Sequence, residues 1–395
     1  MLNFSVDSHR GTFRASIRTR EHERWPGQLA TSWEDVMHKV ALAIARDPNT
    51  RKVSMRDPTG ATAPRTHVFE EAFSPILDES ILNGIDSPRL GPKWWRMARE
   101  IRRLHARYDA VLTWGEKLSL SLLLHNQFAR VRQPHIAMMY QFEKPNIRVP
   151  LSAFKKNLHS VITWSSVQRQ ALIERIGFPR ERVYLIRHYV DQVFYRPRPM
   201  EEDMICAAGA EMRDYATLLE AVRGTDVRCH IATDHVRIPG RIRLLSDRRV
   251  PIGNFCAPPD THVTAGRMSL TELRNLYARS KFVVVPLRAS DTDNGVTVIL
   301  EAMAMGKPVI CSRTRGQVDV IQEGVTGIYV PIGDAAALRA AILSLWTEPQ
   351  RAREMGRNAR AYVEKYHTLE KFTSTARSAA EAALDGRPAP DTCWD

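Results

Sequence analysis

The sequence predicts an α/β protein with two doubly wound parallel sheets, and three observations support this prediction. The chain has 395 residues, enough for two domains of the usual roughly 100–200 residues. Its second half alternates buried-type apolar runs with amphipathic segments over short links, which is the pattern of a parallel sheet flanked by helices. The segment YRPRPMEED interrupts this pattern and places the hinge between domains near residues 190–203.

The second half gives the clearest element pattern. The expected strands cover 204–210, 227–233, 261–269, 281–287, 306–312 and 324–331. The expected helices cover 216–224, 269–280 and 334–346. The helix at 269–280 begins with Ser269 and carries a glutamate three residues later, which is the capping-box pattern. The run KFVVVPL at 281–287 is apolar without alternation, as expected of a strand buried on both faces.

The first half is predicted less completely, because residues 1–90 show poor periodicity. Further along, the patterns predict a strand, loop and helix over 107–126, strands at 134–143, 160–166 and 181–190, and a Ser-capped helix at 165–178. We therefore expect a first Rossmann-like domain over 1–195, a second over 196–368, and a C-terminal helix and tail over 369–395 that packs back on the first. The two domains should face a cleft that holds the ligands.

The net charge of +13 lies entirely in the first half of the chain. Residues 1–200 contain 32 Lys and Arg against 19 Asp and Glu, whereas residues 201–395 contain 25 of each. This asymmetry favours an anionic partner for the first half, although an arginine-rich composition without a selected partner explains it equally well. The five cysteines form no CxxC pair, which argues against a zinc or redox site.

The N-terminus has no apolar signal-peptide region, and no run of 18 apolar residues occurs, so we expect a cytoplasmic protein without a membrane span. One segment, GPKWWRMAREIRRLHARY at 91–108, places tryptophans and aliphatic residues on one face of a helix and arginines elsewhere. Such a helix either packs on the sheet or lies on an anionic membrane surface. The second interpretation predicts peripheral contact with the inner membrane face.

The stretch DTDNGVTVILEAMAMGKPVI at 291–310 predicts an anion site. It follows a buried strand, and its glycine precedes a helix whose first amides have no partner within the helix. Asp293 lies just before that helix and Glu301 lies inside it, so a phosphate at the helix end would sit between two carboxylates that accept hydroxyl groups. A ligand with phosphates in the middle and sugar hydroxyls at both ends is a nucleotide-sugar.

This stretch resembles the donor-site motif of the retaining glycosyltransferases with the GT-B fold, of the family-4 type (glycosyl transferases group 1). In that motif two glutamates stand eight positions apart, and Asp293 replaces the first of them. The segments RHYVDQVFYRP, AGAEMRDYATLLEAV, AGRMSLTELRNLYARSKFVVVPL and GQVDVIQEGVTGIYVPIGDAAALRAAI resemble further family segments in the same order. The resemblance extends over residues 160–370 almost without a break.

The resemblance implies a role for each matching position. Asp293 would hold the donor sugar, Glu301 the ribose, and Arg213 the diphosphate. The remaining donor-binding positions are Gly209, Arg267, Met268, Asn294, Gly295, Val296 and Thr297. The resemblance also implies a UDP-, GDP- or ADP-sugar as donor substrate, with no cofactor and no metal, so we interpret the DTD sequence at 291–293 as a coincidental match to a metal motif. The sequence does not identify the acceptor, and we expect no nucleic-acid partner.

The first half departs from the family pattern. It lacks the Gly-rich loop of the family, and Tyr140-Gln141 occupies a place where a histidine is common. Glu116 begins a helix facing the expected cleft, so it is either a catalytic-side ligand for hydroxyls or an ordinary first-turn carboxylate; His125 and His188 are the histidine candidates. The implied mechanism is front-face retaining transfer. An epimerase of the same fold and a non-catalytic nucleotide- or polyanion-binding protein remain alternatives.

Overall fold

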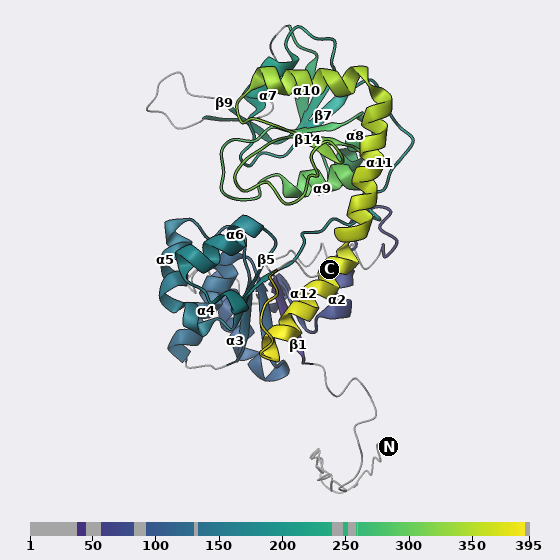
Figure 1. Cartoon of the computed structure of the whole chain (residues 1–395). Coiled ribbons are helices and arrows are strands. Elements are labelled where there is room, and N and C mark those ends of the chain that lie inside the picture. The colour runs from purple at the N-terminus through teal and green to yellow at the C-terminus, as the bar shows by residue number, and fades with distance from the viewer. Residues whose placement is uncertain are drawn as a thin grey trace, which may run out of the picture. The chain divides into compact units, whose positions relative to one another are not determined.

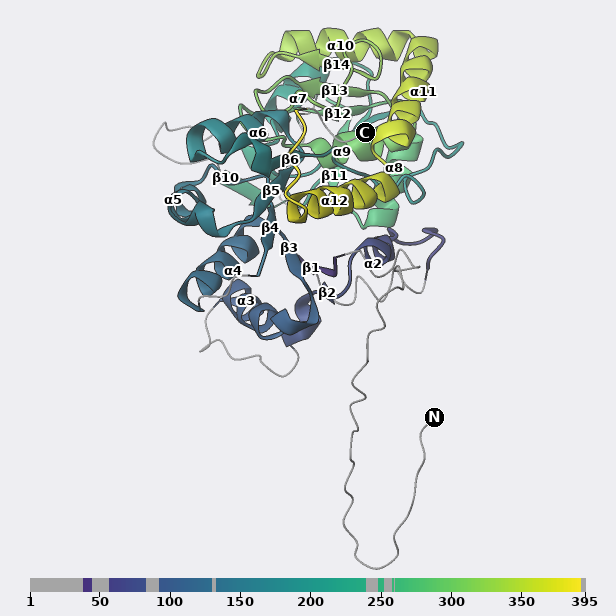
Figure 2. The same ribbon diagram turned by 60° about the horizontal axis from the view of Figure 1, so that its bottom comes forward.

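The computed structural model describes residues 38–44, 57–82, 92–129, 133–238, 248–251, 258 and 260–391. These residues belong to one compact unit built on two parallel six-stranded sheets (Figures 1 and 2). We call the first sheet with its helices the first lobe, and the second sheet with its helices the second lobe. The predicted α/β class with two Rossmann-like sheets is confirmed.

The first sheet consists of β1 (Val40–Ile44), β2 (Ile76–Leu77), β3 (Ala110–Trp114), β4 (His135–Met138), β5 (Ser160–Thr163) and β6 (Val183–Leu185). The strand order is β2-β1-β3-β4-β5-β6 and all pairs are parallel. The loops that follow β3, β4 and β5 therefore emerge at one edge of the sheet. Its helices are α2 (Phe69–Ala72), α3 (Lys93–Arg103), α4 (Glu116–Ala129), α5 (Pro145–Phe154) and α6 (Ser166–Ala171), which continues as a π-helical turn at Leu172–Ile176.

The second sheet consists of β7 (Ile205–Ala208), β8 (Cys229–Ala232), β11 (Val263–Gly266), β12 (Val283–Val285), β13 (Val309–Ser312) and β14 (Gly327–Val330). Its order, β11-β8-β7-β12-β13-β14, is that of a Rossmann sheet, in which ligands bind where the strand order reverses. That reversal lies between β7 and β12. A separate antiparallel ribbon joins β9 (His235–Ile238) to β10 (Arg248–Pro251). Each of the six strands predicted in the second half is found.

Helices cover both faces of the second sheet (Figure 1). One face packs against α8 (Leu270–Arg279), α9 (Val296–Ala304) and α11 (Pro349–Tyr366), and the other against α7 (Tyr215–Val222) and α10 (Ala335–Thr347). The predicted capping box is present, since the Ser269 hydroxyl accepts from the Glu272 amide while the Glu272 carboxylate accepts from the Ser269 amide. Burial on both faces explains why β12 reads as an unbroken run of valines.

The last helix, α12 (Leu369–Leu384), follows α11 after a break at residues 367–368 (Figure 2). Its apolar side, from Leu369 to Ala383, is buried in the same cluster as the β1, β3, β4 and β5 side chains of the first sheet. The chain therefore completes the first lobe with its C-terminal helix. The domain limits at residues 195 and 368 remain predictions.

The helix predicted at 91–108 corresponds to α3, and most of its apolar face is buried against the rest of the first lobe. Met97 and Ile101 are fully buried. Trp94 packs against the cluster around them, and the Trp95 ring lies 3.9 Å from the His125 ring of α4. These contacts favour the packed-helix interpretation, and membrane contact remains a prediction. No helix in the described residues combines the length and the apolarity that crossing a membrane requires.

Candidate donor-binding site

The N-terminus of α9 lies at the reversal point of the second sheet. The chain leaves β12, turns through residues 286–294 and enters α9 at Gly295, whose φ is +89°. The Val296 amide donates to the Asp293 carbonyl at 3.2 Å, and the next backbone bond runs from the Ile299 amide to the Gly295 carbonyl at 3.0 Å. The amides of Thr297 and Val298 have no backbone acceptor among the described residues. As predicted, the helix presents unpaired N–H groups and the positive end of its dipole.

Arg213 lies beside this helix end. Its side chain is 5% exposed, and its guanidinium donates to the carbonyls of Ala208 at 2.8 Å and Glu211 at 2.9 Å. A Cβ atom built on Gly295 would lie 3.6 Å from its Nη1, and one built on Gly209 would lie 2.7 Å from its Nη2. In the described part of the chain, the hydrogen bonds given to the Arg213 side chain all run to backbone carbonyls. A buried, always-charged group held only by carbonyls keeps its positive charge available for an anion.

The backbone that carries Arg213 has an uncommon conformation. Met212 has a φ of +54°, in the left-handed region that non-glycine residues rarely occupy. Gly209, the residue after β7, has a φ of +89°. The Met212 carbonyl accepts from the Arg288 amide at 2.9 Å, which ties the loop after β7 to the loop after β12. Such outliers concentrate at functional sites, so this loop supports the site assignment.

Asp293 is positioned from both lobes. Its carboxylate accepts a hydrogen bond from the Trp164 indole at 2.8 Å, and its carbonyl accepts one from the Gln317 side chain at 3.2 Å. Burial raises the pKa of Asp293 to about 6, the Trp164 bond opposes this rise, and the charges of Asp319 and Glu116 add to it. The predicted sugar ligand is therefore buried and oriented, and it takes up a proton at a higher pH than an exposed aspartate does.

Glu301 lies one and a half turns into α9 and is 8% exposed. Its Oε2 accepts a hydrogen bond from the Tyr277 hydroxyl at 2.9 Å. Burial raises its pKa to about 7, although tyrosine hydroxyls and the charge of Arg213 lower it. The Glu301 carboxylate is thus buried against tyrosine hydroxyls, and its role as the ribose ligand remains a prediction.

This burial makes the stability of the unliganded protein depend on pH. Because the pKa of Glu301 is higher in the folded than in the unfolded state, its contribution favours folding below about pH 4.5 and declines as the pH rises through about 7. At pH 8 the Glu301→Gln variant should therefore be more stable than the wild type by up to about 3 kcal/mol, and it should unfold at a higher temperature. Differential scanning fluorimetry from pH 5 to 8.5 measures the difference in unfolding temperature between variant and wild type, and this difference should become smaller toward pH 5. A gap that is constant with pH would contradict a buried, ionised Glu301.

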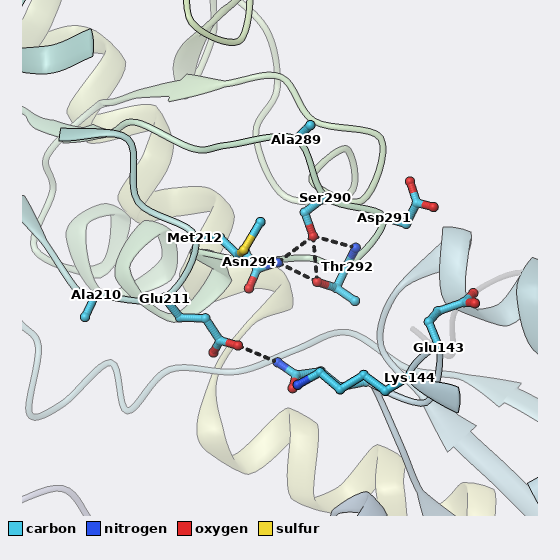
Figure 3. A pocket seen from close by; sticks show the side chains of 11 residues that line it. Glu143, Lys144, Ala210, Glu211, Met212, Ala289, Ser290, Asp291, Thr292 and Asn294 are labelled. Atoms are coloured by element: carbon cyan, nitrogen blue, oxygen red, sulfur yellow. Dashed lines mark hydrogen bonds between the residues drawn. The ribbon is translucent and has the colours of Figure 1, made fainter. Parts of the chain in front are cut away.

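Two cavities meet at this site. The inner chamber, of about 240 Å³, is lined by the start of α9 (residues 293–297), by Glu211 and by Trp114, Tyr140, Gln141, Trp164 and His188 of the first lobe. The outer chamber, of about 810 Å³, is lined by Gln141, Glu143, Lys144, residues 210–212, residues 289–292 and Asn294 (Figure 3). Gln141, Glu211 and Asn294 line both, so the two spaces are adjacent.

The outer chamber has several hydrogen-bonding side chains in its wall, beside the apolar Ala210, Met212 and Ala289. Asn294 donates to the Ser290 hydroxyl at 2.7 Å and bonds Thr292, and the Glu211 carboxylate accepts from Gln141 at 3.5 Å (Figure 3). Hydroxyl, amide and carboxylate groups of this kind recognise polyhydroxylated molecules. The outer chamber is thus suited to a second, sugar-like substrate next to the inner one.

Aromatic rings form the first-lobe wall of the inner chamber. Trp164 stacks on Tyr140 with ring centres 4.7 Å apart, and His188 lies 4.8 Å from Trp164. Burial lowers the pKa of His188 to about 3, and its Nδ1 accepts from the Tyr189 amide at 2.6 Å. A neutral histidine held in this way contributes shape and hydrogen bonding. His125, the other candidate, contacts α3 and lines neither of the two chambers.

The Glu116 carboxylate binds backbone amides of the first lobe. Its Oε1 accepts from the amides of Tyr140 and Gln141, both at 2.7 Å, and so fixes the loop after β4. It does not line either chamber. Arg267 is exposed and Met268 half-buried just after β11, and neither lines these chambers. The roles predicted for these three residues remain predictions.

The two aspartates of the DTD sequence have separate partners: Asp291 pairs with Arg315 at 3.5 Å, whereas Asp293 bonds Trp164. No group of three metal-ligating side chains occurs in the described ranges. The residues that sequence reasoning missed are Trp164, Glu211, Tyr277 and Gln317. Trp164 had a usable signal, because it follows the buried run SVIT and so lies at the carboxyl end of a strand.

Two Rossmann-like lobes with a site at the switch point of the second define the class of protein: this is the GT-B fold of glycosyltransferases. Sucrose-phosphate synthase from Thermosynechococcus elongatus superposes with a TM-score of 0.63, covering 88% of this chain and 100% of that one at 16% identity. HepE from Anabaena, solved in complex with UDP-glucose, gives a TM-score of 0.60 with the same coverage at 15% identity.

Residues 256–362 match the family model of the glycosyl transferases group 1. Among curated proteins, the D-rhamnosyltransferase WbpZ of Pseudomonas aeruginosa is 36% identical over 104 residues, which are 26% of this chain and 27% of that protein. The D-inositol 3-phosphate glycosyltransferase of Nocardia farcinica is 24% identical over 223 residues, 51% of this chain and 49% of that protein. The matches thus span half or less of these relatives.

Proposed function

We propose that this protein is a retaining, metal-independent glycosyltransferase that moves a sugar from a nucleotide-diphosphate-sugar to a hydroxylated acceptor. The observation that carries the proposal is the inner chamber, where the open end of α9, Arg213 nearby and the Asp293 carboxylate come together. A diphosphate fits unpaired amides beside a buried arginine. Fold neighbours that carry UDP or UDP-glucose add support for such a donor.

The proposed arrangement assigns each part of the donor to a group. The diphosphate lies at the amides of Thr297 and Val298, Glu301 takes the ribose hydroxyls on one side, and Asp293 takes the sugar hydroxyls on the other. The aromatic wall of the inner chamber covers the sugar ring and excludes water, which limits hydrolysis of the donor. The acceptor enters through the outer chamber.

In the proposed transfer step the bond between the anomeric carbon and the diphosphate oxygen breaks as the acceptor oxygen bonds to that carbon on the same face. The acceptor proton passes to the departing phosphate, so no protein nucleophile is required. Negative charge grows on the leaving diphosphate, where Arg213 and the amides of α9 stabilise it in a buried setting. Asp293 stays ionised and holds the sugar while positive charge develops on its ring.

The test begins with binding of UDP-, GDP- and ADP-sugars by calorimetry, followed by transfer assays with the donor that binds. Glu301→Ala should weaken binding of that donor by about 10²-fold, because two ribose hydroxyls lose a charged acceptor. Glu323→Ala, an exposed carboxylate of the same lobe that pairs with Arg313, is the matched control and should bind normally. Conversion of the donor to a stereoisomer without acceptor would indicate an epimerase, and equal binding by Glu301→Ala would contradict the proposal.

A further inference from the structure

The turn between β5 and α6 contacts two carboxylates of the second lobe. The indole Nε1–H of Trp164 donates to Oδ2 of Asp293 at 2.8 Å. Two residues later, Ser166 donates its amide and its hydroxyl to Asp319 at 2.8 and 2.6 Å. Asp319 thus lies at the N-terminus of α6, where a negative charge is favourable. The same short turn therefore contacts the loop after β12 and the segment after β13.

The two contacts differ in their surroundings. The bond from Ser166 to Asp319 is exposed, whereas Trp164 and Asp293 are only 6% and 8% exposed. Stacking on Tyr140 and contact with His188 fix the plane of the indole ring. A buried hydrogen bond to a carboxylate is stronger and more directional than an exposed one. Trp164 is therefore able to set the orientation of Asp293, whereas Ser166 contributes mainly to contact between the lobes.

We propose that Trp164 is a positioning residue through which the first lobe orients Asp293 for the donor sugar, so that sugar recognition requires the β5–α6 turn to be seated on the second lobe. This inference rests on the proposed function, because it takes Asp293 as the sugar ligand. The indole is a donor only, so it occupies one carboxylate oxygen and leaves the other for sugar hydroxyls. It carries no charge and exchanges no proton with the substrate.

The contact also keeps Asp293 ionised. Burial raises the pKa of this carboxyl, the Trp164 bond lowers it, and the negative charges of Asp319 and Glu116 raise it. Glu211, Tyr140 and His188 line the same chamber, and Arg213 lies beside the adjoining helix end. Loss of the indole N–H should therefore raise the pKa of Asp293, whereas neutralising Asp319 should lower it. The opposite shifts expected for the pKa of Asp293 distinguish a Trp164 that orients this carboxylate from a turn that only holds the lobes together.

The experiment compares Trp164→Phe, which keeps an aromatic ring but loses the N–H, with two variants of the neighbouring contact. Ser166→Ala weakens only that contact, whereas Asp319→Asn weakens it and also removes a negative charge that raises the pKa of Asp293. In Trp164→Phe we expect the KM for the nucleotide-sugar to rise about tenfold. The affinity for the nucleotide without sugar should stay within about twofold, because the diphosphate and ribose ligands are untouched. The acid limb of the pH–rate profile should move to higher pH in Trp164→Phe and to lower pH in Asp319→Asn.

Two further measurements decide the outcome. In an Asp293→Ala background, Trp164→Phe should have no added effect on the KM, because nothing remains to be oriented. Carboxyl-carbon NMR of the unliganded protein should show a higher pKa for Asp293 in Trp164→Phe than in the wild type. An unchanged pKa, an unchanged KM, or an equal effect in the Asp293→Ala background would overturn the inference. If the wild type binds no nucleotide or nucleotide-sugar, the proposed function fails, and the NMR titration still tests the contact.

Discussion

Replacing Arg213 by alanine should lower the rate of sugar transfer by about 10²–10³-fold, the usual cost of removing one preorganised group that stabilises a leaving anion. The side chain is almost fully buried and has only carbonyl partners among the described residues, so its charge is available to the diphosphate of the proposed donor. The loss should appear mainly in kcat, because charge on the leaving group grows in the transition state. Steady-state kinetics with saturating donor measure it.

The matched control is Arg339→Ala, because Arg339 also donates to backbone carbonyls, those of Ala221 and Arg223, but far from the chambers. It should keep full activity. Arg213→Lys should retain part of the rate, since lysine keeps the charge but loses the fork of donors. Thermal unfolding of each variant separates a catalytic loss from a folding loss. A folded Arg213→Ala with normal kcat would remove Arg213 from the proposed mechanism.

The second lobe was predictable because its local signals agree with its tertiary structure. The valines of β12 are buried on both faces, and the Ser269 capping box forms as its spacing indicates. The first lobe was harder, since β1 is a five-residue strand that lies between β2 and β3 in the sheet, and its pairing with β3 joins Val40 to Ala110. No local pattern indicates such a pairing. The stretch after β1, where the family has its Gly-rich loop, lies outside the described residues.

The site was predictable to the extent that it lies within one segment. Asp293, Gly295 and Glu301 follow one another on a loop and a helix, so their spacing places them at one helix end. Trp164 reaches Asp293 across 129 positions, and Tyr277 reaches Glu301 across 24, and such distances depend on how the lobes and helices pack. For Glu116, in contrast, the sequence suggested a ligand role where the fold shows a structural contact. Its position at a helix start allowed a ligand role, but only the fold shows that two backbone amides occupy one of its oxygens.

Replacing Gly295 by alanine should weaken donor binding by about 10²-fold, as a displacement of about 1 Å in a binding group does. With φ at +89°, any side chain at this position is strained by about 1–3 kcal/mol. The added Cβ would also lie only 2.9 Å from Cγ1 of Val285 and 3.5 Å from Cδ2 of Leu287. Because β12 is fully buried, α9 has to yield, and its first amides move away from the diphosphate position.

Gly324→Ala separates these two effects. Gly324 has a φ of +72°, so alanine is strained there too, but the space around its Cβ position is open. Both variants should lose stability in urea unfolding through backbone strain, Gly295→Ala the more because of its contact with Val285. Only Gly295→Ala should lose affinity for the nucleotide in calorimetry. Equal nucleotide affinities in the two variants would show that close packing of α9 on β12 does not position the amides. The diphosphate would then have to bind elsewhere than at the start of this helix.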